Sequence, residues 1–527
     1  RRNIYKKNIM STVINTRSPY YFKVSNANLD SVKLQLYIWT GTHAQRTSAY
    51  LRYTITKDQR LDELDRGTTS STTANKLVDS TQNFNTTAQV GSFVKNTTDN
   101  TTASVTAIDS DSTLSLSADI MASGENYILF AKPYVVFELS ELIRDYLETE
   151  YNNYATDTVW VDADITIYNS SGTIVQVNSQ DTNTSTFLGI DGYGYFEDGT
   201  NPRETTTPMI LQENTDVYYF DGQDIKIPVF AEAATITVSL TSSAGANINW
   251  EAADDFWETN DSTWGSGTTD LTITDNGNTN QKIQYVIIED TDILNDGDTV
   301  TFSSLKDSGT TTATTANKLV DGTQNFTSTV RVGDLVSNTT DSTTATVTAV
   351  DSDTILSLSA DIMTSGENYQ IKYEANKVIT LKKVNECKFS PLNVIFYNKY
   401  GALQNLWFFK KSITNINITS EKFKNNILDI ENSGGTPSYA LSKHQEKKFM
   451  ANGKESITMN TGFYPQSYNE VVRQKMLAEQ VWVDDLSNVL PINLKSNSLQ
   501  FKKSVNDKLI TYTVQFDYAF DKINNIL

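Results

Sequence analysis

"ANKLVDSTQNF" spans Ala74–Phe84, and "ANKLVDGTQNF" spans Ala316–Phe326 of the same 527-residue chain. Moving the sequence by 242 positions aligns residues 74–127 with 316–369 without a gap, and about 40 of the 54 positions are identical. The two copies are separated by unrelated sequence. They are therefore not successive units of a solenoid, in which neighbours stack to bury a core. The chain carries a duplicated module in two separate places.

The module has the sequence pattern of a small β unit. In the second copy, "RVGDLVSN", "TATVTAV", "TILSLSADI" and "NYQIKY" alternate apolar and polar residues, and "NTTDST", "DSD" and "TSGE" separate them. This pattern predicts four or five strands joined by tight turns in a small barrel-like or two-layer β unit. The expected core of the second copy consists of Leu319, Val320, Phe326, Val332, Leu335, Val336, Val347, Leu356, Leu358, Ile362 and Tyr369.

Strand-like sequence flanks both copies. "VKLQLYIWTG" and "YLRYTITKD" precede the first copy and predict a strand pair, "KPYVVFELSELIRDYL" after it predicts a strand and a short helix, and "VWVDADITIYNSSGTIVQV" predicts a hairpin around Ser171–Gly172. "KIQYVIIED" and "DTVTFSSL" precede the second copy, and "KVITLKKV" follows it. Insertions are tolerated at exposed turns where few contacts cross. We therefore expect each copy to be inserted into a different β domain and to protrude from it.

The expected fold class is mainly β, with several β-sandwich or Ig-like domains, two inserted barrel-like repeats and a C-terminal α+β or β-rich domain with short helices. Abundant Thr together with 26 Tyr and 22 Phe favours strands. The expected boundaries are 1–66 and 131–212 for the first host domain, 67–130 for the first repeat, 213–306 and the closing strand 372–385 for the second host domain, 307–371 for the second repeat, and 386–527 for the C-terminal domain.

The C-terminal region contains further strand and helix signals. "PLNVIFYNKYGALQNLWFFKKS" predicts two strands about a turn at Asn398–Gly401, and "SYNEVVRQKMLAEQVWV" predicts one helix whose modest amphipathic stripe includes Lys475. "LITYTVQFDYAF" alternates strictly and places Ile510, Tyr512, Val514, Phe516, Tyr518 and Phe520 on one face. Such a strand requires a partner sheet, either in its own domain or in a neighbouring subunit.

Charge and composition exclude several classes of partner. The net charge of −20 predicts a surface that repels nucleic acid and anionic membranes, and no apolar segment approaches the roughly 18 residues that cross a bilayer. The basic start "RRNIYKKNIM" lacks the apolar stretch of a signal peptide, and Met10 is a candidate native start. Cys387 is the only cysteine, so the chain can form neither an internal disulfide nor a zinc site of several thiolates. We expect Cys387 to be a buried apolar residue.

Few residues have the chemistry of an active site. His43 and His444 are the only histidines and lie about 400 residues apart, so neither a Ser-His-Asp triad nor a histidine metal site is expected. The phosphate-binding glycine motifs are absent, and "GYGYFEDG" at Gly192–Gly199 has the pattern of a turn. We assign no catalytic, cofactor-binding or metal-binding residue and expect no cofactor.

Acidic clusters offer oxygen ligands but fit turns better. A calcium site in "DILNDGDTV" would use Asp292, Asn295, Asp296 and Asp298. An Asp-Gly pair between two strands is, however, a strong hairpin signal, and we favour the hairpin. The "DSD" segments, which contain Asp109, Asp111, Asp351 and Asp353, are interpreted as solvated turns.

Three tryptophans are the candidate ligand-binding residues. In "WEAADDFWETNDSTW", Trp250, Trp257 and Trp264 recur every seven residues among acids and amides. Exposed aromatic faces beside hydrogen-bond acceptors would stack against sugar rings. The alternative, which we favour, is that these tryptophans cap the core of the second host domain.

Several segments resemble structural proteins of tailed bacteriophages from marine environments. The repeat segments "ANKLVDSTQNF", "NTTDNTTASVTA" and "DSDSTLSLSADIMASGENY" resemble a module that recurs in such proteins, and "LQLYIWTG", "NKYGALQNLWFFKKS" and "LQFKKSVNDKLITYTVQFDYAFDKINN" resemble virion proteins of these phages. The resemblance covers about half of the chain and brings no catalytic pattern with it. It implies a virion component built from β domains, located in the tail, baseplate or fibres rather than the head.

Three functions are compatible with these patterns. The first is a non-enzymatic assembly protein that forms a symmetric homo-oligomer, contacts other virion proteins and is assembled in the host cytoplasm into the virion, with a head or neck decoration protein as the alternative structural role. The second is an adhesin that binds a host-surface glycan. The third is a polysaccharide-cleaving enzyme, which needs two carboxylates roughly 5 to 10 Å apart. With 63 acidic residues the sequence does not single out such a pair.

Overall fold

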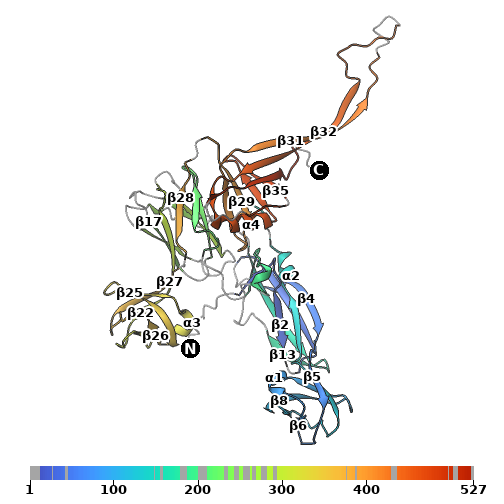
Figure 1. Ribbon diagram of the computed structural model, residues 1–527, viewed down its shortest axis with the longest axis vertical. Helices are drawn as coiled ribbons and strands as arrows, with labels where there is room; N and C mark the ends of the chain where they lie inside the picture. Colours follow the sequence, from blue (N-terminus) through green and yellow to red (C-terminus); the bar gives the residue numbers. More distant parts are fainter. Residues whose placement is uncertain are drawn as a thin grey trace. The chain divides into compact units, whose positions relative to one another are not determined.

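The structure is a computed structural model that describes residues 12–26, 28–41, 46–147, 149–154, 158–178, 187–199, 210–230, 235–241, 249–252, 262–263, 269–274, 282–288, 294–374, 377–385, 388–428, 436–496, 498–501 and 509–523. It is mainly β, as the sequence predicts (Figure 1). The described residues form two compact units, one of residues 12–147 and 158–199, the other of residues 149–154 and those from 210 onward. None of the helices in these ranges is long and apolar enough to cross a membrane.

Two sheets enclose the core of the first host domain. The larger sheet follows the order β1 (Thr12–Asn15), β14 (Phe187–Ile190), β12 (Val159–Tyr168), β3 (Ser31–Trp39) and β4 (Leu51–Asp58), with β13 (Ile174–Asn178) also paired to β12. The smaller sheet pairs β2 (Tyr21–Ser25) with β11 (Tyr134–Glu138), and α2 (Ser140–Arg144) follows it. Alternate residues of β3, such as Leu34 and Leu36, pack with Val135 and Phe137 of β11 in one buried cluster. Two short 3-10 turns, Ser48–Tyr50 and Phe196–Asp198, complete the described elements.

The local predictions for this domain are confirmed. Strands β3 and β4 pair antiparallel, and β12 turns into β13 through Asn169–Gly172, where the Gly172 N–H donates to the Asn169 carbonyl at 2.8 Å. Gly172 has φ 75°, a left-handed conformation that glycine adopts without the steric cost of a side chain. The expected strand and short helix are β11 and α2.

Both copies of the repeat have the same strand order. The first follows β5 (Glu63–Thr68), β10 (Asn126–Phe130), β7 (Phe93–Asn96), β8 (Thr102–Ser110), β9 (Thr113–Leu116) and β6 (Lys76–Val78), with α1 (Phe84–Thr87). The second follows β22 (Thr299–Thr310), β27 (Asn368–Glu374), β24 (Leu335–Asn338), β25 (Thr343–Ser352), β26 (Ile355–Leu358) and β23 (Lys318–Val320), with α3 (Phe326–Thr329). The gapless alignment of the sequences thus extends to the pairing of the strands.

Seven residues of the expected repeat core are fully buried, namely Leu319, Phe326, Val336, Val347, Leu356, Leu358 and Tyr369. Val320, Leu335 and Ile362 are partly buried. The prediction for Val332 is wrong, because its side chain is 65% exposed in the turn that precedes β24. A residue in a turn departs from the alternation that assigns inward positions along a strand.

The two copies are joined to their hosts differently. Among the described strands, the sheet of the first copy contains no host strand. In the second copy, β22 pairs with β27 over Ser303–Thr310, and its earlier residues pair with the host strands β17 (Thr235–Thr241) and β28 (Ile379–Lys383). The boundary expected between residues 306 and 307 therefore falls inside one strand. The expectation that both copies stand apart from their hosts is wrong for the second, because its sheet continues the host sheet.

The second host domain encloses its core between two sheets. The shared sheet also contains β15 (Asp216–Tyr219) beside β28, and β20 (Thr269–Thr274) beside β17. The other sheet follows β16 (Ile225–Phe230), β21 (Ile283–Ile288), β18 (Asn249–Ala252) and β19 (Ser262–Thr263). Ile227 of β16, Val238 of β17 and Phe302 of β22 belong to one buried cluster, so apolar side chains of both sheets pack together.

The C-terminal domain is a seven-stranded antiparallel sheet with a helix. Its order is β30 (Leu403–Phe408), β29 (Leu392–Tyr397), β34 (Val481–Asp484), β35 (Val489–Leu494), β37 (Thr513–Tyr518), β32 (Glu446–Asn460) and β31 (Ile413–Lys424). A short pair, β33 (Tyr464–Pro465) with β36 (Leu509–Ile510), the 3-10 turn Gln466–Tyr468 and α4 (Asn469–Leu477) accompany it. The two strands predicted about Asn398–Gly401 are β29 and β30.

The partner of the final alternating strand lies in its own domain. Strand β37 pairs with β32 on one side and with β35 on the other, so it is not an edge strand. Tyr512, Val514 and Phe516 are buried, whereas Phe520 lies beyond the strand and is 39% exposed. Of the two alternatives that the sequence left open for this strand, the structure gives the intramolecular one.

Candidate functional site

The most prominent candidate surface is a two-stranded arm. Strand β31 pairs with β32 from Ile413–Thr458 out to Lys424–Glu446, but β32 pairs with β37 only over Ser456–Asn460. Residues 416–424 of β31 and 446–455 of β32 therefore form a ribbon of two strands, named here the arm, which leaves the sheet (Figure 1). An isolated pair of strands is marginally stable in water. The arm thus has the structure expected of a segment that contacts another surface.

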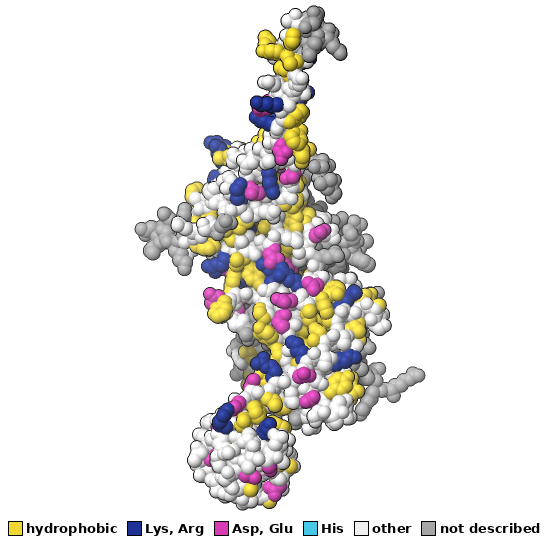
Figure 2. Space-filling view, turned by 90° about the vertical axis from the view of Figure 1, so that its right-hand side faces the viewer, with side chains coloured by type: hydrophobic (Ala, Val, Ile, Leu, Met, Phe, Trp, Pro, Cys, Tyr) yellow, Lys and Arg dark blue, Asp and Glu magenta, His cyan; other side chains and the backbone are white. Residues whose placement is uncertain are grey.

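The arm exposes apolar and basic side chains. Ile416 is 50% exposed and Ile418 is 62% exposed, and Phe423 and Phe449 form an exposed edge-to-face pair with ring centroids 5.9 Å apart. Figure 2 shows hydrophobic and basic side chains along this ribbon. The paired outer residues carry four lysines and two glutamates, Lys422, Lys424, Lys447, Lys448, Glu421 and Glu446. The arm is therefore locally basic in a chain whose net charge is −20.

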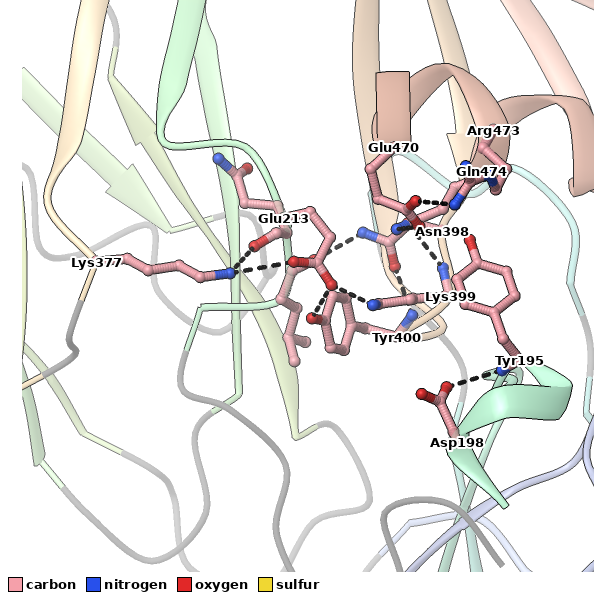
Figure 3. A network of polar contacts seen from close by, with 12 residues as sticks. Tyr195, Asp198, Glu213, Lys377, Asn398, Lys399, Tyr400, Glu470, Arg473 and Gln474 are labelled. Atoms are coloured by element: carbon pink, nitrogen blue, oxygen red, sulfur yellow. Dashed lines mark hydrogen bonds and ion pairs between the residues drawn. The ribbon is translucent and has the colours of Figure 1, made fainter. Parts of the chain in front are cut away.

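A buried polar network ties residues 211–216 to the turn between β29 and β30 (Figure 3). The Asn398 side-chain amide donates to the Leu211 carbonyl at 2.6 Å, and the Gln404 amide donates to Asn214 Oδ1 at 2.7 Å. Tyr400 Oη donates to Glu213 Oε1 at 2.6 Å, so a carboxylate joins the same network. Because these side chains are largely removed from water, each would cost free energy without its partner.

Glu213 is held ionised by its cationic neighbours. Lys399 forms an ion pair with Glu213 Oε1, and Lys377 Nζ lies 3.5 Å from Oε2. Burial acts to raise the pKa of this carboxyl, but the contacts with Lys399, Tyr400 and Lys377 outweigh it and lower the pKa to about 2. A carboxylate with this pKa takes up no proton near neutral pH. The network therefore has the chemistry of a structural anchor and not that of a general base.

Lys475 is a buried amine in α4. Its side chain is fully buried, and its Nζ lies 3.5 Å from Met476 Sδ and 4.6 Å from the centroid of the Phe516 ring. Burial lowers the pKa of this ammonium to about 7, because these neighbours replace little of the hydration that the charge loses.

A groove of about 450 Å³ lies beside β34 and β35. Its lining includes Glu150, Tyr151, Glu479, Gln480, Trp482 and Asn493. The rings of Tyr151 and Trp482 have centroids 5.8 Å apart, and the Gln480 amide donates to Thr149 Oγ1 at 2.8 Å. The size is that of a small-molecule site, and aromatic, amide and carboxylate groups together suit a polyhydroxylated ligand.

The side chains of the three candidate tryptophans lie outside the described part of the chain. Trp250 belongs to β18, whose backbone alone is described, and Trp257 and Trp264 lie outside the described residues, as do His43 and Cys387. His444 is described and lies in an exposed stretch between the strands of the arm. The two alternatives for the tryptophans, sugar contact and core capping, thus both stay predictions.

The expected "NDGD" hairpin is wrong, although a turn is present. Strands β21 and β22, on either side of it, belong to different sheets. Within the turn, the Asn295 N–H donates to Asp298 Oδ2 at 2.9 Å, and Gly297 has φ 97°. Asp292 lies outside the described residues. A tight turn is thus encoded locally, whereas the sheet that its second strand joins depends on distant strands.

The "DSD" aspartates have defined partners. Asp109 accepts from Lys76 Nζ at 2.7 Å, and Asp351 accepts from Lys318 Nζ at 2.8 Å. These pairs are about one-third exposed, so each adds little to stability, and all four aspartates are exposed at or beside the β8–β9 and β25–β26 turns, which agrees with the expected solvated turns. Within the part of the chain that the structure describes, three or more histidine, cysteine or acidic side chains never gather closely enough to hold a metal ion.

Sequence reasoning did not identify the arm, the Glu213 network or the groove. The run "ITNINITS" at Ile413–Ser420 carries no charge and is rich in Ile and Thr, which is the signal that could have revealed an open edge strand. The Glu213 network and the groove join segments far apart in the chain, so no local pattern encodes them. Lys475 did appear in the expected helix stripe, and its position among apolar residues was the available signal.

In comparisons with known proteins, no protein-family model and no curated protein sequence matches this chain.

Proposed function

We propose that this chain is a structural component of a tailed-phage virion, associated with the tail, baseplate or fibres, and that it works as a symmetric oligomer displaying its β modules. Its location in a phage particle rests on the resemblance of "NKYGALQNLWFFKKS", "LQLYIWTG" and the repeat segments to virion proteins. The role requires no catalysis. Its partners are other copies of the chain and neighbouring virion proteins.

The arm is the observation that carries the assembly role. Ile416, Ile418 and Phe423 expose between 45% and 62% of their surface on a ribbon of two strands. Covering an apolar side chain releases roughly 25 cal/mol for each Å² removed from water. A contact made by this ribbon would therefore stabilise both the ribbon and the assembly.

Purified particles of a phage that encodes the chain provide the test. Quantitative mass spectrometry should find the chain in particles at a fixed copy number relative to the major tail protein. Antibodies against the first repeat should label the tail, baseplate or fibres in electron micrographs. Label confined to the head or neck would favour the decoration role, and absence from purified particles would reject a virion role.

The groove beside β34 and β35 supports a second candidate function, binding of a host-surface glycan. Tyr151 supplies aromatic surface, backed by the buried ring of Trp482, and Glu150, Glu479 and Asn493 supply hydrogen-bonding groups around about 450 Å³. Loss of one stacking ring should weaken such binding. Tyr151→Ala should then reduce retention on immobilised host polysaccharide, while Tyr439→Ala, an exposed tyrosine of the β31–β32 connection, should not. Equal retention of both variants and the unaltered chain would remove this candidate.

A further inference from the structure

The outer edge of β31 is an open strand edge. Strand β31 is the last strand of the seven-stranded sheet, and among the described strands it pairs with β32 alone. An edge strand presents a row of backbone N–H and C=O groups that can pair with another chain. This edge extends over Ile413–Lys424, the whole length of the strand.

The inner part of this edge lacks the usual protection against pairing. Proteins commonly place charges, prolines or bulges on exposed edges to prevent them from adding strands. Ile413–Ser420 contains neither charge nor proline and consists mainly of Ile, Thr and Asn. The first bulge in its pairing with β32 falls between Ser420 and Glu421, where the charged residues begin. The protected part of the strand thus starts only after eight unprotected residues.

The opposite edge of the sheet is already engaged. The backbone N–H of Leu403, at the start of β30, donates to Tyr285 Oη at 2.6 Å, and Tyr285 belongs to the second host domain. Leu403, Leu406 and Phe408 are each 1% exposed. An incoming strand would therefore pair with β31 and not with β30.

We propose that β31 pairs antiparallel with β31 of a second copy of this chain, about a two-fold axis at Asn417. In this register Ile416 of each copy lies opposite Ile418 of the other, and the pair forms twice. Asn415 lies opposite Thr419, and Ile413 opposite Glu421, so no like charges face each other within Ile413–Glu421. The contact is isologous, as two-fold dimers require.

Cross-strand chemistry makes the second copy the fitting partner. Pairs of β-branched side chains on neighbouring strands each contribute roughly 0.2–1 kcal/mol beyond the backbone hydrogen bonds. Both isoleucines are at least half exposed, so the pairing covers surface that the isolated chain leaves in water. The two seven-stranded sheets then become one sheet that runs through both copies. This inference rests on the proposed assembly role, and it identifies the surface of contact, the edge of β31, and the partner, a second copy of the chain.

Cysteine cross-linking of the full chain tests the register. With Cys387→Ser as background, Asn417→Cys places two thiols on the two-fold axis, where directly opposite Cα atoms are about 4.5–5.5 Å apart, within reach of a disulfide. Lys454→Cys is the matched control, because Lys454 lies opposite Asn417 on β32 and is also exposed. Its two copies would be separated by three strand spacings, about 14 Å, too far for a disulfide.

Mild oxidation should convert the Asn417→Cys chain to a covalent dimer and leave the Lys454→Cys chain monomeric. A monomeric Asn417→Cys chain, or equal cross-linking of both variants, would overturn the proposal. The outcome is separable from that of the proposed function. A cross-linked dimer of a chain that is absent from particles would reject only the virion role, and a virion chain without the cross-link would reject only the strand pairing.

Charge substitutions test the same register without cysteine. Ile416→Lys with Ile418→Lys places like charges opposite each other twice, and dimerisation measured by analytical ultracentrifugation should weaken at least tenfold. Ile416→Lys with Ile418→Glu places opposite charges there and should retain the dimer. Both positions are exposed, so circular dichroism should show that each variant stays folded. Equal dimerisation of the two double variants would contradict the pairing.

Discussion

Tyr127 donates its phenolic hydrogen to the buried carboxylate of Asp79 at 2.9 Å, and Tyr369 makes the same contact with Asp321 at 2.8 Å in the second copy. Burial, followed by contact with the aspartate, raises the pKa of each phenol. In both copies the hydroxyl of the threonine two residues after the aspartate, Thr81 or Thr323, also donates to the aspartate. The contact joins the last strand of each module, β10 or β27, to the residue that follows its three-residue strand, β6 or β23.

Removal of the tyrosine hydroxyl group should destabilise each module. Tyr127→Phe leaves a buried carboxylate oxygen without its donor, and such a loss costs roughly 1–3 kcal/mol. Hydrogen exchange of the amides in β7 to β10 should report this loss, and Tyr369→Phe should act equally in β24 to β27. If neither substitution accelerates exchange, the contact does not stabilise the modules.

A methyl group at Gly309 should disrupt the same contact. A Cβ there would lie 2.6 Å from Asp321 Oδ2 and 2.7 Å from Tyr369 Oη, so the two side chains would have to separate. Gly309→Ala should cost roughly 1–3 kcal/mol, as overpacking typically does. Gly322→Ala is the matched control, since its nearest neighbour is 3.9 Å away and the first copy has Ser80 at this place. Equal unfolding of the two variants in denaturant would contradict the clash.

Glu213→Gln should weaken the second unit in a pH-dependent way. The folded state lowers the pKa of Glu213 to about 2, so its contribution is fully present above the ordinary carboxyl pKa of about 4.3 and is lost as the pH falls towards 2. The variant should therefore unfold earlier in denaturant than the unaltered chain at pH 7, with a difference that shrinks in acid. Glu446→Gln, which removes an exposed partner of Lys422, should change little. A difference that stays constant from pH 7 to pH 3 would argue against this account.

Lys475→Met should stabilise the C-terminal domain most at low pH. The folded state lowers the pKa of Lys475 to about 7, so the unfolded chain binds the extra proton between pH 7 and about 10.4, and stability rises across this range by at most about 1.4 kcal/mol for each pH unit. Below pH 7 the full cost of burying the charge applies. Hydrogen exchange in α4 and β37 should be slower in the variant at pH 6, with a benefit that fades towards pH 10. A pH-independent benefit would indicate a packing effect alone.

The two modules should differ in how easily they can be removed. The Arg60 N–H donates to the Tyr134 carbonyl at 2.7 Å at the base of the first copy, so residues 61–133 can be replaced by a short linker between two residues that are already paired. The first host domain should stay folded, with its thermal transition retained. Removal of residues 307–371 cuts into β22 and should unfold the second host sheet. Equal tolerance of both deletions would contradict the shared strand.

Local patterns predicted the fold well wherever alternation and turn chemistry act within one segment. The β29–β30 and β12–β13 hairpins and the inward residues of β37 followed from period-two alternation and short turns. Sheet membership did not follow, as β22 shows, because nothing within "DTVTFSSL" indicates that one strand serves both a host and a module. The Glu213 network joins residues nearly two hundred positions apart, and such contacts have no local signature. The open edge of β31 required knowledge of which strands occupy the remaining edges.

The shared strand gives the second module a different mechanical connection from the first. A load applied to the second module passes directly along the backbone of β22 into the host sheet, where the hydrogen bonds to β17 and β28 resist it together. A load applied to the first module passes through two chain crossings held by the Arg60–Tyr134 bridge, where a few bonds take all of the force. The second module therefore has a stiff connection to its host, and the first module, of similar sequence, has a compliant one.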